Sequence, residues 1–295
     1  MCKITMNLTS PKDVKDWCRE NGFHPSRAMG QNFLIDRNTL DAIIATSGVA
    51  EGRRVLEVGP GLGVLTQALL EAGARVTAVE KDRRLAAFLR ETLAPKFPGL
   101  TLVEGDMLKQ DLEALSKAVE SRREPSKAFE AVISNLPYSV GTRILVDLAL
   151  HPLAPATFTL LLQTEVAERI AAPENHPERA LLSVWLQRLY DVRSAQKIPP
   201  TCFYPRPEVD STLLHLVRHE RHPLAPWQAA AFATLTRHAF THRRKQLFPL
   251  LRALKKIPAD ALQAIFSNLQ LDPKVRPEEL SVAAWRELAI QFSNP

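Results

Sequence analysis

The stretch Glu57-Val58-Gly59-Pro60-Gly61-Leu62-Gly63 decides the fold of this chain. It follows a short apolar run and precedes residues 64–71, which have helical periodicity. Its three glycines stand at alternate positions, where they allow positive backbone torsions and close approach of a ligand to the main chain. A glycine-rich turn between a buried strand and a helix is typical of the ligand-binding edge of a doubly wound sheet.

Strands and helices alternate on both sides of this turn. Apolar runs predict strands at residues 55–58, 75–79, 100–103, 131–134 and 158–162, and a late one at 211–217. Helical periodicity occupies residues 64–71, 82–93, 142–150 and 165–171. This alternation predicts an α/β domain with a parallel sheet, right-handed crossovers and helices on both faces.

The pattern changes after His219. Residues 226–240, 243–254, 258–269 and 277–291 have helical periodicity, and we expect no strand there. The sequence therefore predicts an α/β domain over residues 1–218 and a smaller all-helical domain over 219–295. The tail has a net charge of +5, against +1 for the rest. Such a basic segment favours a polyanion as partner, and a solvated basic helical surface is the alternative.

Composition excludes several classes of protein. The chain has 295 residues and is 45% hydrophobic and 24% charged, which is an ordinary globular balance. No stretch approaches the roughly 18–20 apolar residues of a membrane span, and residues 1–12 lack the apolar core of a signal peptide. The three cysteines have no metal-like spacing. We therefore expect free thiols in a reducing cytoplasm and no membrane partner.

Acidic residues end the second and third predicted strands. Glu80 follows Gly59 by 21 residues, where a carboxylate can accept both hydroxyls of a ribose. Asp106 can accept from an adenine amino group while Met107 packs on the ring, or it can cap the helix that follows. The dinucleotide-binding fingerprint Gly-x-Gly-x-x-Gly would need its third glycine at position 64, where this chain has Val64. The missing glycine argues against a nicotinamide-dependent oxidoreductase.

Asn135-Leu136-Pro137-Tyr138 ends the fourth predicted strand. Proline fixes one torsion and keeps the residue before it extended. The turn can therefore present the Asn135 amide and neighbouring carbonyls outward beside the flat Tyr138 ring. Amide and carbonyl oxygens accept hydrogen bonds, and a ring stacks on a base, so the site suits a planar amine such as the N6 of adenine. The alternative is a proline turn in which Tyr138 only packs.

This order of loops resembles the S-adenosylmethionine-dependent methyltransferases, and the Asn-Leu-Pro-Tyr end of the fourth strand is the pattern of their N6-adenine branch. More segments narrow the match: Gly30-Gln31-Asn32-Phe33-Leu34, and residues 163–169, 203–211, 242–245 and 280–281. In this order they resemble the ribosomal RNA adenine dimethyltransferase family, in particular its bacterial small-subunit (16S) branch. The resemblance runs from about residue 20 to the end.

The resemblance implies a Rossmann-like methyltransferase sheet that uses S-adenosylmethionine and no metal. The cofactor-binding residues it suggests, together with the loop analysis above, are Asn32, Leu34, Gly59, Gly61, Glu80, Asp106, Met107 and Asn135. Catalysis would fall to Asn135, Leu136, Pro137 and Tyr138. The substrate would be two adjacent adenosines near the 3′ end of small-subunit ribosomal RNA, in an immature ribosomal subunit. We expect Arg243, Arg244 and Lys245 to contact RNA phosphates, Phe203 to be a second stacking candidate, and the protein to be a monomer.

Two segments depart from the family pattern. Residues 178–183 lack a Tyr-Gly pair, and the loop at 121–127 is longer than usual. Two other functions also stay open. One is a large-subunit ribosomal RNA adenine methyltransferase of the antibiotic-resistance type. The other is a ribosome-assembly factor that keeps the fold without turnover, which the intact set of Gly59, Glu80 and Asn135 disfavours.

Overall fold

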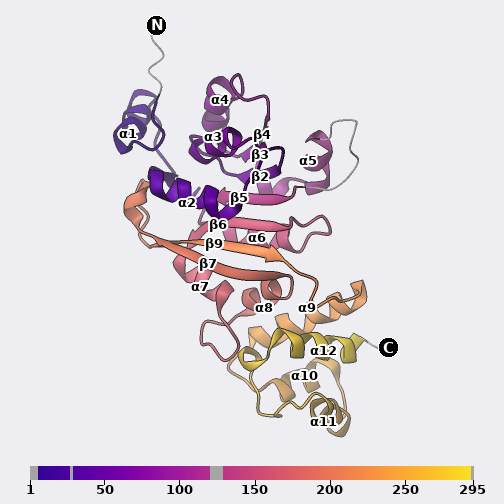
Figure 1. Ribbon diagram of the computed structural model, residues 1–295. Coiled ribbons are helices and arrows are strands. Elements are labelled where there is room, and N and C mark those ends of the chain that lie inside the picture. The colour runs from indigo at the N-terminus through magenta and orange to yellow at the C-terminus, as the bar shows by residue number, and fades with distance from the viewer. Residues whose placement is uncertain (1–5, 27–28, 120–128, 294–295) are drawn as a thin grey trace. The chain divides into compact units, whose positions relative to one another are not determined.

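The computed structural model describes residues 6–26, 29–119 and 129–293 (Figure 1). The chain divides into two compact units. The first comprises Met1–Ala167 and Arg193–Val217, and the second comprises Glu168–Val192 and Arg218–Pro295. Residues 168–192, which the expected division at 218 placed in the first domain, thus belong to the second unit. The loop at 121–127 lies outside the described residues.

The strands are β1 (Phe33–Leu34), β2 (Arg54–Val58), β3 (Arg75–Glu80), β4 (Leu100–Glu104), β5 (Ala131–Asn135), β6 (Thr157–Gln163), β7 (Tyr190–Ile198), β8 (Phe203–Tyr204) and β9 (Ser211–Arg218). The helices are α1 (Pro11–Glu20), α2 (Arg37–Ser47), α3 (Val64–Glu71), α4 (Arg83–Thr92), α5 (Leu112–Val119), α6 (Gly141–Ala149), α7 (Thr164–Ala171), α8 (Leu181–Gln187), α9 (Pro226–Thr241), α10 (Leu247–Lys255), α11 (Ala259–Asn268) and α12 (Val282–Ser293). Short 3₁₀ turns are η1 (Met107–Lys109), η2 (Pro200–Cys202) and η3 (Pro277–Glu279).

A seven-stranded sheet has the order β4-β3-β2-β5-β6-β9-β7. The five strands predicted from the apolar runs, β2 to β6, pair in parallel, which confirms the α/β prediction. β9 pairs antiparallel to β6, with Ser211 opposite Gln163. Val55 and Leu56, which are consecutive in β2, are both fully buried. Because successive strand side chains point to opposite faces, both faces of the sheet are covered.

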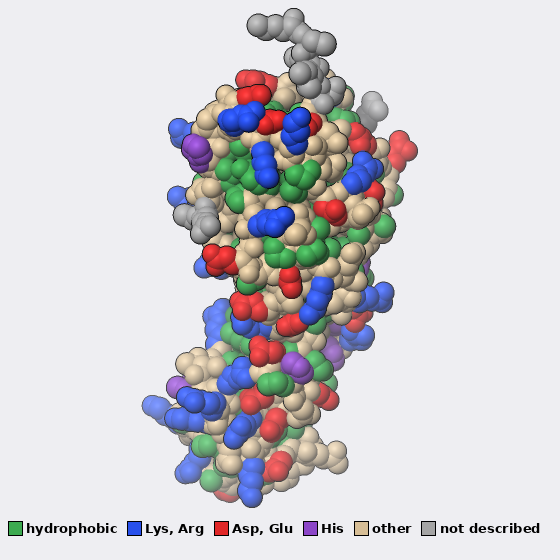
Figure 2. Space-filling model, turned by 90° about the vertical axis from the view of Figure 1, so that its left-hand side faces the viewer, with side chains coloured by type: hydrophobic (Ala, Val, Ile, Leu, Met, Phe, Trp, Pro, Cys, Tyr) green, Lys and Arg blue, Asp and Glu red, His purple; other side chains and the backbone are tan. Residues whose placement is uncertain are grey.

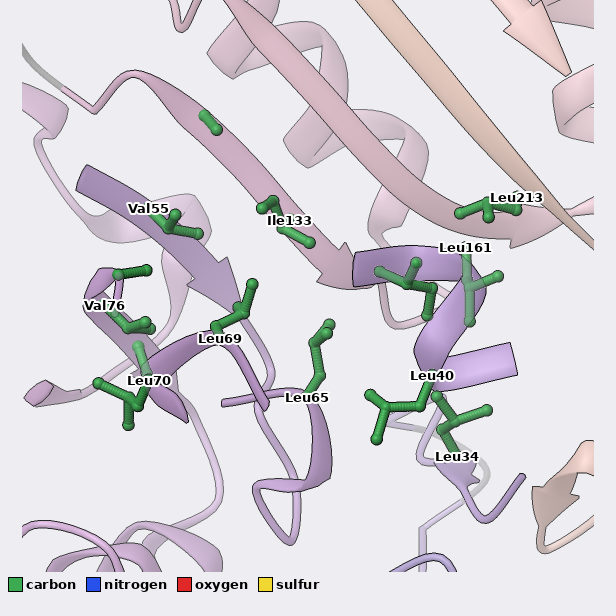
Figure 3. Packing of buried hydrophobic residues seen from close by; sticks show 14 of the residues in the cluster. Leu34, Leu40, Val55, Leu65, Leu69, Leu70, Val76, Ile133, Leu161 and Leu213 are labelled. Atoms are coloured by element: carbon green, nitrogen blue, oxygen red, sulfur yellow. The ribbon is translucent and has the colours of Figure 1, made fainter. Parts of the chain in front are cut away.

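One face of the sheet packs against α2 and α3. Val55, Ile133 and Leu161 from three strands meet Leu40 of α2 and Leu69 of α3 in one buried cluster (Figure 3). α3 occupies the bounds that the sequence predicts, because the glycine turn ends directly before it. This packing fixes the turn at the carboxyl edge of β2, where the neighbouring strands also end.

The second unit is helical over α9 to α12, as predicted. α12 begins at Val282 and not at the expected residue 277, because Ser281 accepts a hydrogen bond from the Ala284 amide (3.1 Å) and caps the helix there. α10 begins only at Leu247, so residues 243–245 form a turn. Among the described residues, none of the helices has the length and apolarity needed to traverse a bilayer.

Candidate active site

The glycine turn has the conformation that its sequence predicts. Gly59, Gly61 and Gly63 all have positive φ angles, of 68°, 61° and 86°. The Gly59 amide donates to the Val79 carbonyl at 2.9 Å, which fastens the turn to β3. A side chain at Gly61 would lie 3.0 Å from the Phe33 ring. The turn therefore needs glycine both for its torsions and for the close approach of its neighbours.

Glu80 is held by one backbone amide of the glycine turn and one directly after β3. Its side chain is 5% exposed, and its two oxygens accept from the Gly61 amide (3.0 Å) and the Asp82 amide (2.8 Å). Burial raises the pKa of Glu80, and these backbone hydrogen bonds oppose the rise. Each carboxylate oxygen has a further lone pair, so Glu80 can still accept from the hydroxyls of a ribose.

Glu57 is a residue of this site that the sequence analysis missed. It is 2% exposed, and its Oε2 has no hydrogen-bond partner in the described part of the chain. Burial, and secondarily the charge of Glu80, raises the pKa of Glu57 to about 8. An acid within the apolar run of β2 was the available signal, because a buried carboxyl oxygen without a partner is costly unless a ligand uses it.

Asp106 has two partners. Its carboxylate pairs with Lys81 Nζ (2.9 Å) and accepts from the Leu108 amide (3.1 Å). The hydrogen bond from Lys81 is the main cause that lowers the pKa of Asp106. Asp106 therefore caps η1, as the alternative reading expects. It is ionised and lies beside the buried Met107, so it can also accept from an amino group.

The segment Asn135–Tyr138, here called the Asn135 turn, is fixed by other parts of the first unit. Asn135 Nδ2 donates to the Asn32 carbonyl at 2.9 Å, which leaves Oδ1 as the acceptor of that amide. The Tyr138 hydroxyl hydrogen-bonds Ser211 Oγ. Gly30 has a φ of +66°, and a Cβ there would lie 2.9 Å from the Tyr138 amide nitrogen. The N-terminal segment thus packs directly on the Asn135 turn.

One cavity of the first unit collects the predicted cofactor and catalytic residues. Its lining includes Asn32, Leu34, Gly59, Gly61, Glu80, Asp106, Met107, Asn135, Leu136, Pro137 and Tyr138. Glu57 lines the same cavity. The cavity therefore places carboxylates, an amide acceptor, a phenol ring and glycine backbone around one space. Such a set can bind a nucleoside and present a second planar group to it.

The predicted RNA contacts lie elsewhere. Phe203 is 1% exposed and pairs with Leu34 in the core. Its ring is thus covered by its neighbours in this structure, and its role as the weaker stacking candidate stays a prediction. Arg243, Arg244 and Lys245 belong to the second unit and stand in the turn before α10, not on a helix. Arg243 donates to the Pro177 carbonyl, and the other two side chains are exposed.

Comparisons with known proteins agree with this geometry. A family model described as "Ribosomal RNA adenine dimethylase" matches residues 22–293. The "Ribosomal RNA small subunit methyltransferase A" of Opitutus terrae is 38% identical to this chain over 98% of the chain and 100% of that protein. The protein of the same name from Bacillus licheniformis is 33% identical over 97% of each.

Two solved structures share the fold. A dimethyladenosine transferase from Plasmodium falciparum has a TM-score of 0.74 at 22% identity, covering 88% of this chain and 96% of that one. The 23S rRNA methyltransferase ErmE has a TM-score of 0.68 at 26% identity, covering 89% of this chain and all of that one. Both support a Rossmann-like methyltransferase sheet.

Proposed function

Because the chain belongs to the ribosomal RNA adenine dimethylase family, we propose that it dimethylates N6 of two adjacent adenosines near the 3′ end of small-subunit (16S) ribosomal RNA. The methyl donor is S-adenosylmethionine. We further propose that it acts as a monomer, in the cytoplasm, on immature small subunits. The observation that carries the proposal is the fixed Asn135 amide, which lines the same cavity as Glu80 and the glycine turn.

The residues of the cavity fit this cofactor. Glu80 can accept from the ribose hydroxyls, and Asp106 and Met107 can receive the adenine amino group and ring. Because Glu57 carries a proton at neutral pH, its unpartnered Oε2 can hydrogen-bond a water molecule or another polar group at the cavity. S-adenosylmethionine, when bound, supplies a methyl group that its positively charged sulfur activates for transfer.

The Asn135 turn is suited to bind and activate the target adenine. Adenine N6 is a poor nucleophile, because its lone pair is delocalised into the ring. Asn135 Oδ1 and the Leu136 carbonyl can accept the N6 protons and so favour a more pyramidal, more nucleophilic nitrogen. Tyr138 can stack on the base once it has left its helix, which contributes about 1–3 kcal/mol. The remaining task of the protein is alignment of the two groups.

The second unit suits contact with RNA phosphates. Arg244 and Lys245 are exposed in the turn before α10, and Figure 2 shows Lys and Arg side chains on the surface of this unit. Such contacts strengthen binding and orient the RNA without reading its sequence. We therefore assign selection of the target loop to RNA shape.

Mass spectrometry of ribosomal RNA tests the proposal. Small and large subunits from a strain that lacks this methylation are incubated separately with the protein and S-adenosylmethionine, and the RNA of each is digested and analysed. We expect two dimethyladenosines in small-subunit RNA. The similarity to ErmE favours a second candidate, a large-subunit enzyme, which the appearance of dimethyladenosine in large-subunit RNA would support instead.

A further inference from the structure

The Tyr138 ring has a partner outside the Asn135 turn. Its hydroxyl hydrogen-bonds Ser211 Oγ, which lies 73 residues further along the chain. Ser211 is 0% exposed and is the first residue of β9. Burial raises the pKa of Tyr138 above its ordinary value despite this bond. The phenol therefore stays protonated at neutral pH, and the bond joins two neutral hydroxyls.

The direction of β9 explains how Ser211 reaches the Tyr138 hydroxyl. β5 and β6 are parallel, so both end at the same edge of the sheet. β9 runs antiparallel to β6, and Ser211 lies opposite Gln163, the last residue of β6. The first residue of β9 therefore shares an edge with the Asn135 turn. A strand of the opposite direction would begin at the far edge, away from Tyr138.

The two ends of the Tyr138 side chain are thus held separately. At the backbone, Gly30 packs so closely that a Cβ there would lie 2.9 Å from the Tyr138 amide nitrogen. At the hydroxyl, Ser211 restricts rotation of the ring. We propose that Ser211 is a positioning residue for methyl transfer, which holds the Tyr138 ring in the orientation that receives the target adenine. This inference rests on the proposed function, because it requires a base at Tyr138.

Thr212 offers a matched control in the same strand. It is 4% exposed, and its hydroxyl bonds Thr164 Oγ1 at 2.9 Å. Because neighbouring strand residues point to opposite faces, this hydroxyl is directed away from the Ser211 side. Thr212→Val and Ser211→Ala each remove one buried hydroxyl with little change of shape. A general weakening of β9 would affect both variants, whereas loss of ring positioning would affect only Ser211→Ala.

The experiment measures kcat and KM for methyl transfer to small-subunit RNA in Ser211→Ala, Tyr138→Phe, the double variant and Thr212→Val. We expect kcat to fall roughly two- to tenfold in each of the first two, which corresponds to one lost hydrogen bond. The double variant should lose no more than either single one, because both changes remove the same bond. Cofactor affinity should stay unchanged, and Thr212→Val should keep the wild-type kcat.

A fluorescence measurement reports directly whether the Tyr138 ring stacks on the target base. With 2-aminopurine at the target adenosine, the fluorescence of the bound complex should be lower for the wild type, in which the Tyr138 ring stacks on the base, than for Ser211→Ala. An unchanged kcat in Ser211→Ala, additive losses in the double variant, or an equal loss in Thr212→Val would overturn the positioning role alone. A wild-type protein that leaves small-subunit RNA unmethylated would refute the proposed function, and the role of Ser211 with it.

Discussion

Replacing Gly30 with alanine should impair both the fold and the site. Gly30 has a φ of +66°, and a Cβ there would lie 2.9 Å from the Tyr138 amide nitrogen and 3.2 Å from that of Ser139. Both neighbours are backbone atoms, so a flexible side chain cannot yield to the new methyl group. The Asn135 turn, or the segment around Gly30, has to move instead.

The magnitude follows from two contributions. A left-handed conformation costs an L-residue about 1–2 kcal/mol. Relief of the short contact adds the cost of overpacking, about 1–3 kcal/mol. A variant at Gly22 measures the conformational contribution alone, because the φ of Gly22 is +53° and a Cβ there meets nothing within 4 Å. Gly22→Ala should therefore lose only the first contribution in the free energy of unfolding, and Gly30→Ala should lose both.

The turnover number should also differ between Gly30→Ala and Gly22→Ala. The Asn32 carbonyl, two residues after Gly30, accepts the hydrogen bond that fixes Asn135. A displacement of a few tenths of an ångström there misaligns the acceptor of the amine, and a misplacement of about 1 Å can cost 10²-fold. We expect Gly30→Ala to lower kcat about tenfold or more, while Gly22→Ala keeps it. Denaturant unfolding and methyl transfer on the same preparations measure both, and equal unfolding free energies with equal kcat would refute this reasoning.

Three further predictions follow from the site. Asn135→Ala should still bind S-adenosylmethionine in calorimetry but lose methyl transfer, and near-wild-type turnover would contradict the role of its amide. Burial raises the pKa of Glu57 to about 8 from an unfolded value of 4.5, so the folded protein holds a proton that the unfolded chain releases. The free energy of unfolding should thus decline as pH rises between these values, and Glu57→Gln should reduce that decline in a thermal-unfolding series. Alanine at residues 243–245 should weaken RNA binding and lower the salt dependence of the affinity by about 0.7–0.9 per lost phosphate contact, which filter binding across a salt series would check.

The local sequence pattern was sufficient to predict a helix or strand where that element is both buried and bounded by turn residues. The helix at 64–71 was predicted with its observed bounds, because the glycine turn ends directly before it. β7 was not predicted, since residues 193–197 of this strand are exposed and polar residues dominate them. A strand of this kind has no apolar alternation for sequence analysis to detect. The antiparallel direction of β9 likewise depends on its pairing with β6 and has no local signal.

The candidate site likewise contains residues that have a local sequence signal and residues that have none. Glu80, Asp106 and Asn135 were predicted because each ends or follows a strand of a parallel sheet, where ligands bind. The burial of Phe203 has a nonlocal cause, since it depends on the core cluster that residues distant in the sequence form around it. Ser211 was only part of a motif in the sequence, because its contact with Tyr138 requires the register of β9 against β6.

The residues that fix the ligand-facing groups form a second set, which motif analysis does not identify. The Gly61 and Asp82 amides hold Glu80, the Asn32 carbonyl holds Asn135, and Ser211 holds Tyr138. Each bond restricts an acceptor or a ring before any ligand arrives, and such preorganisation lowers the cost of reaching the transition state. Loss of the bonds that hold Asn135 and Tyr138 should therefore reduce kcat more than it weakens cofactor binding, whereas Glu80→Ala, or loss of the bonds that hold Glu80, should weaken cofactor binding first. That contrast separates the groups that bind from those that align.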